Sequence, residues 1–169
     1  MNIGKINADI VKAIYNGRMP VCGYREKDGS YFVTTNGQFG YWLLKEQILF
    51  NTDKIQKLDK KPFNMKDFLS DEHEIYPTET YKKYDGKFIQ KFRNKWPGIE
   101  KWEWITWINS EFLKPISKDF EVHFYQRFYE GKPSGVQPIM AIQEFHIKGS
   151  DKAIKRPLMM FMPYRIFEE

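Results

Sequence analysis

The sequence has 169 residues and a formal net charge of +5, with 41% hydrophobic and 29% charged residues. This size and balance are typical of one folded domain, and they exclude a collagen-like or wholly disordered chain. Cys22 is the only cysteine, which excludes an internal disulfide and a cysteine-rich zinc site. We expect a soluble, cytoplasmic protein, because no apolar run is long enough to span a bilayer and residues 1–12 lack the apolar block of a signal peptide.

Basic charge and aromatic content are the two unusual features of the composition. The pI is near 9.1, and aromatic residues make up 17% of the chain. Aromatic side chains can stack on the bases of a single strand, but β-sheets and protein interfaces also use them. We favour the structural use, since β-propensity alone accounts for most of them.

The first patterned segment predicts a short amphipathic helix. Asn7 is of a type that caps helix N-termini, and Ile10, Val11 and Ile14 then fall on one face. Gly17 stands where a helix commonly ends, because glycine adopts the left-handed conformation without strain. The helix is therefore predicted to begin at Asn7 and to end before Gly17.

Three strands are predicted after this helix, at 21–24, 31–35 and 39–44. Asp28-Gly29 and Asn36-Gly37 separate them, and such pairs favour the positive φ of tight hairpin turns. Residues 1–50 are therefore predicted to form a helix followed by an antiparallel meander.

The middle of the chain, residues 51–101, is more polar. A short helix is predicted at 65–69, an exposed loop at 71–80, and a hairpin over 81–93 around Asp85-Gly86. The hairpin region interleaves aromatic residues with cations, which favours a solvated face and leaves a nucleic-acid surface as the alternative. Under that alternative the DNA-binding candidates here are Lys82, Lys83, Lys87, Lys91 and Arg93.

Residues 102–169 alternate more clearly between apolar and polar positions. Residues 102–108 predict a strand or an unusually aromatic helix, and Asn109 caps a second short helix that Pro115 limits. Further strands are predicted at 120–125, 139–142 and 158–162, the last two separated by the polar segment 148–156.

The two predicted helix starts resemble each other. Residues 6–14 and 108–116 share four identities at a spacing of 102 residues. A three-stranded meander is predicted after each, so the chain reads as two β-α-β-β-β units with an insertion between them. The alternative is that the common requirements of capped amphipathic helices produce the similarity.

The C-terminal segment, Leu158-Met159-Met160-Phe161-Met162-Pro163-Tyr164-Arg165-Ile166, resembles the closing strand of bacterial DNA polymerase sliding clamps. With the repeat, this resemblance implies an α+β fold with antiparallel sheets and a pseudo-two-fold repeat, similar to a single sliding-clamp domain. Residues 1–50 and 102–169 would be the half-units of that one domain, and 51–101 the insertion. A ring would then need several copies of the chain, so a homo-oligomer is expected if a ring forms.

The resemblance also implies where partners bind. Clamp helices carry cations toward the phosphates of duplex DNA, which would assign this role to Lys5, Lys12, Lys114 and Lys118; a solvated helix face is the alternative. Met162, Pro163 and Tyr164 would border a pocket for a short peptide of a replication or recombination protein. Met159, Met160 and Phe161 are instead expected in the core.

The function expected from these observations is that of a non-enzymatic, clamp-like DNA accessory factor for processivity or recruitment, of a kind that phages or mobile elements encode. No cofactor, metal or membrane is expected. A protein-binding module or inhibitor acting through an aromatic surface is the alternative. A metal-dependent nuclease using Glu144, Lys148 and Asp151 is less favoured, because their spacing matches no nuclease motif. His73, His123 and His146 are scattered, and His123 is expected at the surface.

Overall fold

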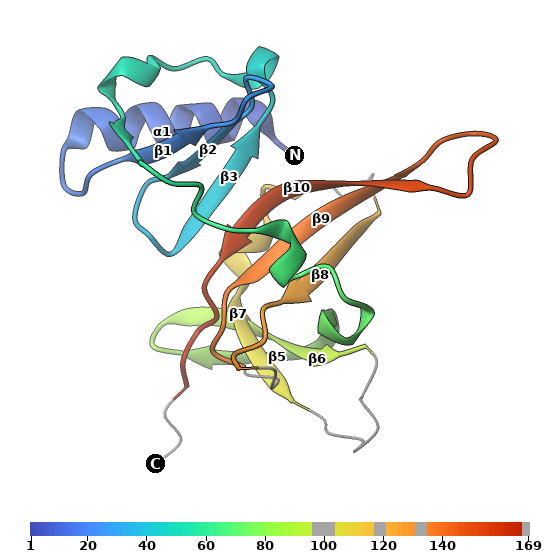
Figure 1. Ribbon diagram of the computed structural model, residues 1–169. Helices are drawn as coiled ribbons and strands as arrows, with labels where there is room; N and C mark the ends of the chain where they lie inside the picture. The colour runs from blue at the N-terminus through green and yellow to red at the C-terminus, as the bar shows by residue number, and fades with distance from the viewer. Residues whose placement is uncertain (96–103, 117–120, 131–134, 167–169) are drawn as a thin grey trace.

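The computed structural model describes residues 1–95, 104–116, 121–130 and 135–166 (Figure 1). Within these residues the chain forms one α-helix, α1 (Ile3–Asn16), and a single sheet of ten strands. The strands are β1 (Cys22–Arg25), β2 (Tyr31–Thr34), β3 (Phe39–Leu43), β4 (Gln56–Lys57), β5 (Glu74–Tyr84), β6 (Lys87–Asn94), β7 (Ile105–Asn109), β8 (Val122–Gln126), β9 (Ile139–His146) and β10 (Ala153–Phe161). Short 3-10 turns are η1 (Lys45–Gln47), η2 (Thr52–Lys54), η3 (Met65–Asp67), η4 (Asp71–His73) and η5 (Ser110–Leu113).

The order of strands across the sheet is β4-β1-β2-β3-β10-β9-β8-β5-β6-β7. Two antiparallel meanders, β1-β2-β3 and β8-β9-β10, meet at the centre, where Gly40 of β3 lies opposite Met160 of β10. The β5–β6 hairpin and β7 continue the sheet beyond β8, and β4 runs parallel to β1. The fold is therefore α+β and dominated by its sheet.

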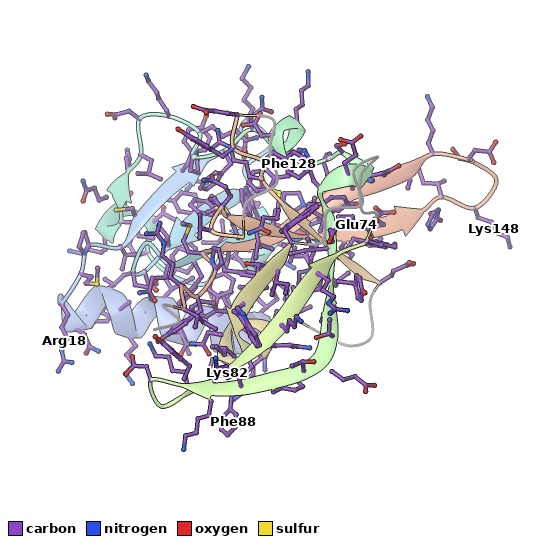
Figure 2. All side chains as sticks on the ribbon, turned by 90° about the horizontal axis from the view of Figure 1, so that it is seen from below. Arg18, Glu74, Lys82, Phe88, Phe128 and Lys148 are labelled. Carbon is purple, nitrogen blue, oxygen red and sulfur yellow. The ribbon has the colours of Figure 1, made fainter. Side chains whose placement is uncertain are left out.

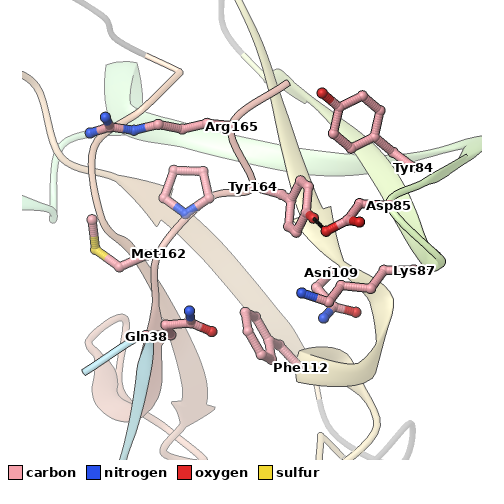
Figure 3. A pocket seen from close by; sticks show the side chains of 10 residues that line it. Gln38, Tyr84, Asp85, Lys87, Asn109, Phe112, Met162, Tyr164 and Arg165 are labelled. Atoms are coloured by element: carbon pink, nitrogen blue, oxygen red, sulfur yellow. Dashed lines mark hydrogen bonds between the residues drawn. The ribbon is translucent and has the colours of Figure 1, made fainter. Parts of the chain in front are cut away.

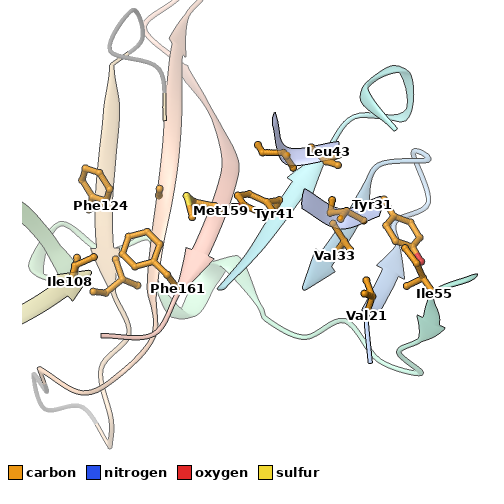
Figure 4. Packing of buried hydrophobic residues seen from close by; sticks show 14 of the residues in the cluster. Val21, Tyr31, Val33, Tyr41, Leu43, Ile55, Ile108, Phe124, Met159 and Phe161 are labelled. Carbon is orange, nitrogen blue, oxygen red and sulfur yellow. The ribbon is translucent and has the colours of Figure 1, made fainter. Parts of the chain in front are cut away.

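The larger core lies on the face of the sheet that α1 and η5 cover. Ile6 and Ile10 of α1 are fully buried in this core. The same core contains sheet residues such as Val33, Met159 and Phe161 (Figure 4). Phe112 of η5 packs against the same core. Each fully buried aliphatic side chain contributes about 1.5–3 kcal/mol to folding, so this face supplies most of the apolar stabilisation.

Residues of opposite parity form a second core on the other face, under the segment 58–69. Phe32, Trp42 and Met160 alternate with the residues of the first core and pack with Phe68. The expectation that Met159, Met160 and Phe161 are buried is confirmed, since their exposed fractions are 0%, 6% and 0%. Strand periodicity divides them between the two faces.

The first helix is confirmed, but its predicted start is wrong. Asn2 is the N-cap, because its side chain accepts a hydrogen bond from the backbone of Lys5. Asn7 is instead buried within α1, where its amide donates to the carbonyls of Ile3 and Gln47, both at 2.9 Å, and accepts from the Leu49 amide at 2.8 Å. The end at Gly17 is confirmed by its left-handed φ of 58°.

The predicted loop at 71–80 is also wrong, because residues from Glu74 onward belong to β5. The register between β5 and β6 shifts between Pro77 and Tyr81, so the strand accommodates a proline at an irregularity. The short helices predicted at 65–69 and after Asn109 are single 3-10 turns, η3 and η5. The segment 148–156 is partly strand, since β10 begins at Ala153.

The meander of β1, β2 and β3 and the hairpin around Asp85-Gly86 are confirmed. Strands are likewise found in the regions predicted at 102–108, 120–125, 139–142 and 158–162; residues 102, 103 and 120 lie outside the described residues.

Candidate functional site

The segment after β10 forms one wall of a pocket. Beyond Phe161 the chain is held by two backbone hydrogen bonds, from Met162 to the Gln38 carbonyl at 2.7 Å and from Tyr164 to the Trp107 carbonyl at 2.6 Å. These bonds place Met162, Pro163 and Tyr164 beside a pocket of about 540 Å³ (Figure 3). Its other lining residues are Gln38, Tyr84, Asp85, Lys87, Asn109, Phe112 and Arg165.

Tyr164 is held in this pocket by three residues of the β5–β6 hairpin. Its hydroxyl donates to the Asp85 carboxylate at 3.2 Å, and its ring meets the Tyr84 ring edge-on, with centroids 5.8 Å apart. The Lys87 ammonium lies 5.2 Å from the centroid of the Tyr164 ring. Burial and the neighbouring Asp85 carboxylate raise the pKa of the Tyr164 hydroxyl. It therefore remains a neutral donor at physiological pH.

The DNA-binding candidates on the β5–β6 hairpin lie on two opposite faces of it. Lys82 is paired with Ile89, and it shares a face with Lys87, Lys91 and Arg93. Lys83 is paired with Phe88 on the opposite face. Lys82 and Phe88 are labelled on opposite sides of this hairpin in Figure 2. The structure thus brings together four of the five hairpin candidates.

That cationic face of β6 also borders a groove of about 870 Å³ along β7. Lys91 lies directly opposite Trp107 in the register between the two strands. Tyr164 and Arg165 line both this groove and the first pocket, so the two hollows adjoin at the C-terminal segment. Sequence analysis missed Trp107 and Arg165 as candidates, because only strand register and the returning C-terminal segment place them here.

The helix cations lie on the solvent-facing side of the molecule. Lys5 and Lys12 are exposed on the outward face of α1, where Lys5 pairs with Asp9 at 3.4 Å. Lys114 follows η5, is exposed, and pairs with Glu111 at 2.6 Å. Lys118 lies outside the described residues. The three described lysines are exposed, and their contact with DNA remains a prediction.

The expectation that His123 is a surface residue is wrong. Its side chain is 18% exposed, and Nδ1 lies 2.7 Å from the Glu74 carboxylate while Nε2 lies 3.1 Å from Glu121. Glu74 also accepts from the Lys95 ammonium at 2.8 Å. Burial opposes ionisation of Glu74, but the hydrogen bonds from His123 and Lys95 outweigh it and lower the pKa of the carboxyl.

Glu144 belongs to a second polar group on the same face. Lys155 lies 3.1 Å from the Glu144 carboxylate and 3.2 Å from the Tyr125 hydroxyl. Burial opposes both charges, but these hydrogen bonds outweigh it, so the pKa of Glu144 is lowered and that of Lys155 is raised. Glu144 is thus engaged by Lys155, whereas Lys148 and Asp151 are exposed near the turn between β9 and β10 (Figure 2).

Within the described residues, no group of three or more His, Cys, Asp or Glu side chains is arranged to hold a metal ion. None of the helices found there combines the length and apolar character needed to cross a membrane. No family model, curated protein or solved structure matches the chain.

Proposed function

We propose that the protein is a non-enzymatic, clamp-like accessory factor that associates with duplex DNA during replication or recombination. The observation that carries this proposal is the symmetric strand order at the centre of the sheet, β1-β2-β3 followed by β10-β9-β8. A helical segment precedes each meander, α1 before β1 and η5 before β8. This arrangement supports two repeated meanders joined edge to edge, with the insertion supplying β4, β5 and β6 and with β7 beyond β6 at the edge of the sheet.

The positions of the two helical segments support the same proposal. Both pack on one core, and Phe112 of η5 lies 5.1 Å from Phe39 of β3 between ring centroids. The N-terminus of α1 is fastened to the segment after η5 by a hydrogen bond from the Asn2 amide to the Pro115 carbonyl, at 2.9 Å. One side of the sheet therefore presents both helical segments together.

Duplex DNA would be bound on that side through Lys5, Lys12 and Lys114. Lys5 and Lys114 already have carboxylate neighbours, and both pairs are exposed. Exposed pairs contribute little energy, so phosphates can compete for these lysines. The resulting attraction is weak and independent of base sequence, which suits a protein that slides.

The pocket at Met162, Pro163 and Tyr164 would hold a partner peptide. Phe112, Pro163 and Met162 offer apolar contacts, and the flexible thioether of Met162 adapts to varied side chains. Lys87 at the rim would favour a peptide with an acidic residue beside its apolar anchor.

A second candidate function is a protein-binding module that makes no contact with DNA. It is favoured by the hairpin of β9 and β10, which extends from the body of the molecule (Figure 1). Phe145, Ile147 and Ile154 on this hairpin are 40%, 50% and 52% exposed. Such an apolar surface is typical of a protein interface.

Light scattering with circular and linear duplex DNA tests the clamp-like proposal. We expect a multimer that is retained on closed circles and lost from linear ends. The double variant Lys5→Gln and Lys12→Gln should weaken retention. The matched control, Lys148→Gln and Lys152→Gln, makes the same charge change on the β9–β10 turn. A monomer indifferent to both forms of DNA refutes the clamp and leaves the protein-binding module.

A further inference from the structure

We infer that the groove along β6 and β7 is a binding site for single-stranded nucleic acid. The basic-aromatic groove is defined by Lys87, Lys91, Trp107, Tyr164 and Arg165. The inference shares only the class of ligand with the proposed function. The clamp proposal places duplex DNA on the side of α1 and η5, whereas this inference places a single strand along β6 and β7.

Aromatic faces are the first requirement of such a site, because every base has a π-face that can stack on them. Trp107 on β7 and Tyr164 on the C-terminal segment line the same groove. Their backbones are joined directly by the hydrogen bond from Tyr164 to the Trp107 carbonyl. Tyr164 is further held by Asp85 and by the edge of the Tyr84 ring. The two platforms are thus fixed relative to each other before a ligand binds, which reduces the entropic cost of binding.

Positive charge along the backbone path is the second requirement. Lys87 and Lys91 lie on the same face of β6, four residues apart, which corresponds to roughly 13 Å along a strand. Arg165 lines the same groove as Lys91 and adds a third cation. The groove along β7 is lined by no carboxylate among the described residues, and Asp85 in the adjoining pocket is engaged by Tyr164. The surface is therefore complementary to a polyanion.

A peptide strand is a poorer fit than a nucleic acid. Peptides that bind beside a strand usually pair with its free edge. The outer edge of β7 is already occupied, since the Trp107 carbonyl accepts from Tyr164 and the Thr106 hydroxyl donates to the Gly135 carbonyl at 2.7 Å. A Cβ added at Gly135 would lie 2.3 Å from the Ile105 carbonyl oxygen, which shows how closely the backbone of residue 135 covers this edge.

Duplex DNA cannot use the aromatic platforms, because its bases are already stacked within the helix. Single strands expose their bases to such faces and track cationic grooves with little sequence preference. The observations therefore favour a single strand over both a peptide and a duplex.

The test is fluorescence anisotropy of an end-labelled oligothymidine of about 15 nucleotides, titrated with the full-length protein at several salt concentrations. We expect binding that weakens as salt rises. The double variant Lys91→Gln and Arg165→Gln should reduce the magnitude of the salt slope by about 1.4, because each phosphate contact on a single strand contributes about 0.7. Trp107→Leu should weaken binding about 5- to 150-fold with an unchanged slope, since it removes stacking and no charge.

The control is again Lys148→Gln with Lys152→Gln, which changes the net charge equally but lies outside the groove. Circular dichroism checks that each variant is folded. If Trp107→Leu does not fold, the variant Lys91→Gln with Arg165→Gln still tests the inference. Equal loss in the control and groove variants overturns the inference, as does absence of binding or tighter binding to a duplex of equal length.

The outcomes also separate this inference from the clamp proposal. Loss of oligothymidine binding with normal retention on circles, in the Lys91 and Arg165 variant, supports two distinct surfaces. If the protein is not retained on circular DNA but binds oligothymidine as expected, the clamp proposal is refuted and the single-strand site stands.

Discussion

Replacing Asn7 by alanine distinguishes a buried tertiary role from a helix cap. The Asn7 side chain donates to the Gln47 carbonyl and accepts from the Leu49 amide, and both groups belong to the segment that follows β3. Its third bond is to the Ile3 carbonyl, one turn earlier in α1. The substitution therefore leaves two part-buried backbone groups without their partner, at a cost of about 1–3 kcal/mol each. The better helix propensity of alanine returns about 0.7 kcal/mol.

The net expectation is a loss of about 1–5 kcal/mol in the free energy of unfolding. Urea denaturation followed by circular dichroism measures it. With a slope of about 2 kcal/mol per molar urea, the midpoint should fall by about 0.5–2.5 M at unchanged slope.

Asn2→Ala is the comparison variant, because Asn2 caps α1 through a single bond to the Lys5 amide. It should cost about 1 kcal/mol. If Asn7→Ala costs no more than Asn2→Ala, the argument for a tertiary role of Asn7 fails.

Three further predictions concern the sheet and the polar groups on it. Gly40→Ala should lower the thermal midpoint markedly, because the added Cβ would lie 2.3 Å from the buried ring of Phe32; an unchanged midpoint would contradict the packing of β3 against β2. The folded-state pKa of Glu74 is lowered, so its contribution is present above the ordinary value of 4.5 and is lost as pH falls through the folded value. The difference in unfolding free energy between the native chain and Glu74→Gln should therefore shrink below that pH, and a constant difference in acid titration would refute the ion pairing. Lys155→Met should destabilise by about 1–3 kcal/mol in urea, because it removes the cation beside the largely buried Glu144 carboxylate, and the loss should diminish when that carboxylate is protonated in acid.

Local conformation is what the sequence determined most directly. The turns at Asn36-Gly37 and Asp85-Gly86 and the end of α1 at Gly17 all have residues with positive φ, and that preference belongs to the residues themselves. The apolar run at 158–162 likewise predicted a buried strand, because a short run of apolar residues is typical of a strand that is covered on both faces.

Asn7 and Pro77 show where local reasoning fails. Asparagine is favoured at helix N-caps, but here its partners Gln47 and Leu49 are 40 and 42 residues away in the chain. Proline argues against a regular strand, but a register shift in the pairing with β6 accommodates it within β5. Neither distant partners nor register are encoded in a short window of sequence.

The candidate surfaces were decided by the tertiary structure. Sequence analysis selected Met162, Pro163 and Tyr164 from a resemblance and Lys87 and Lys91 from their charge. Register alone set Lys91 opposite Trp107, and the hydrogen bond from Tyr164 to the Trp107 carbonyl brought the C-terminal segment beside both. Composition determined that the chain is basic and aromatic, whereas the pairing of distant strands decided which cations and which rings share one groove, because strand pairing depends on contacts between residues far apart in the chain.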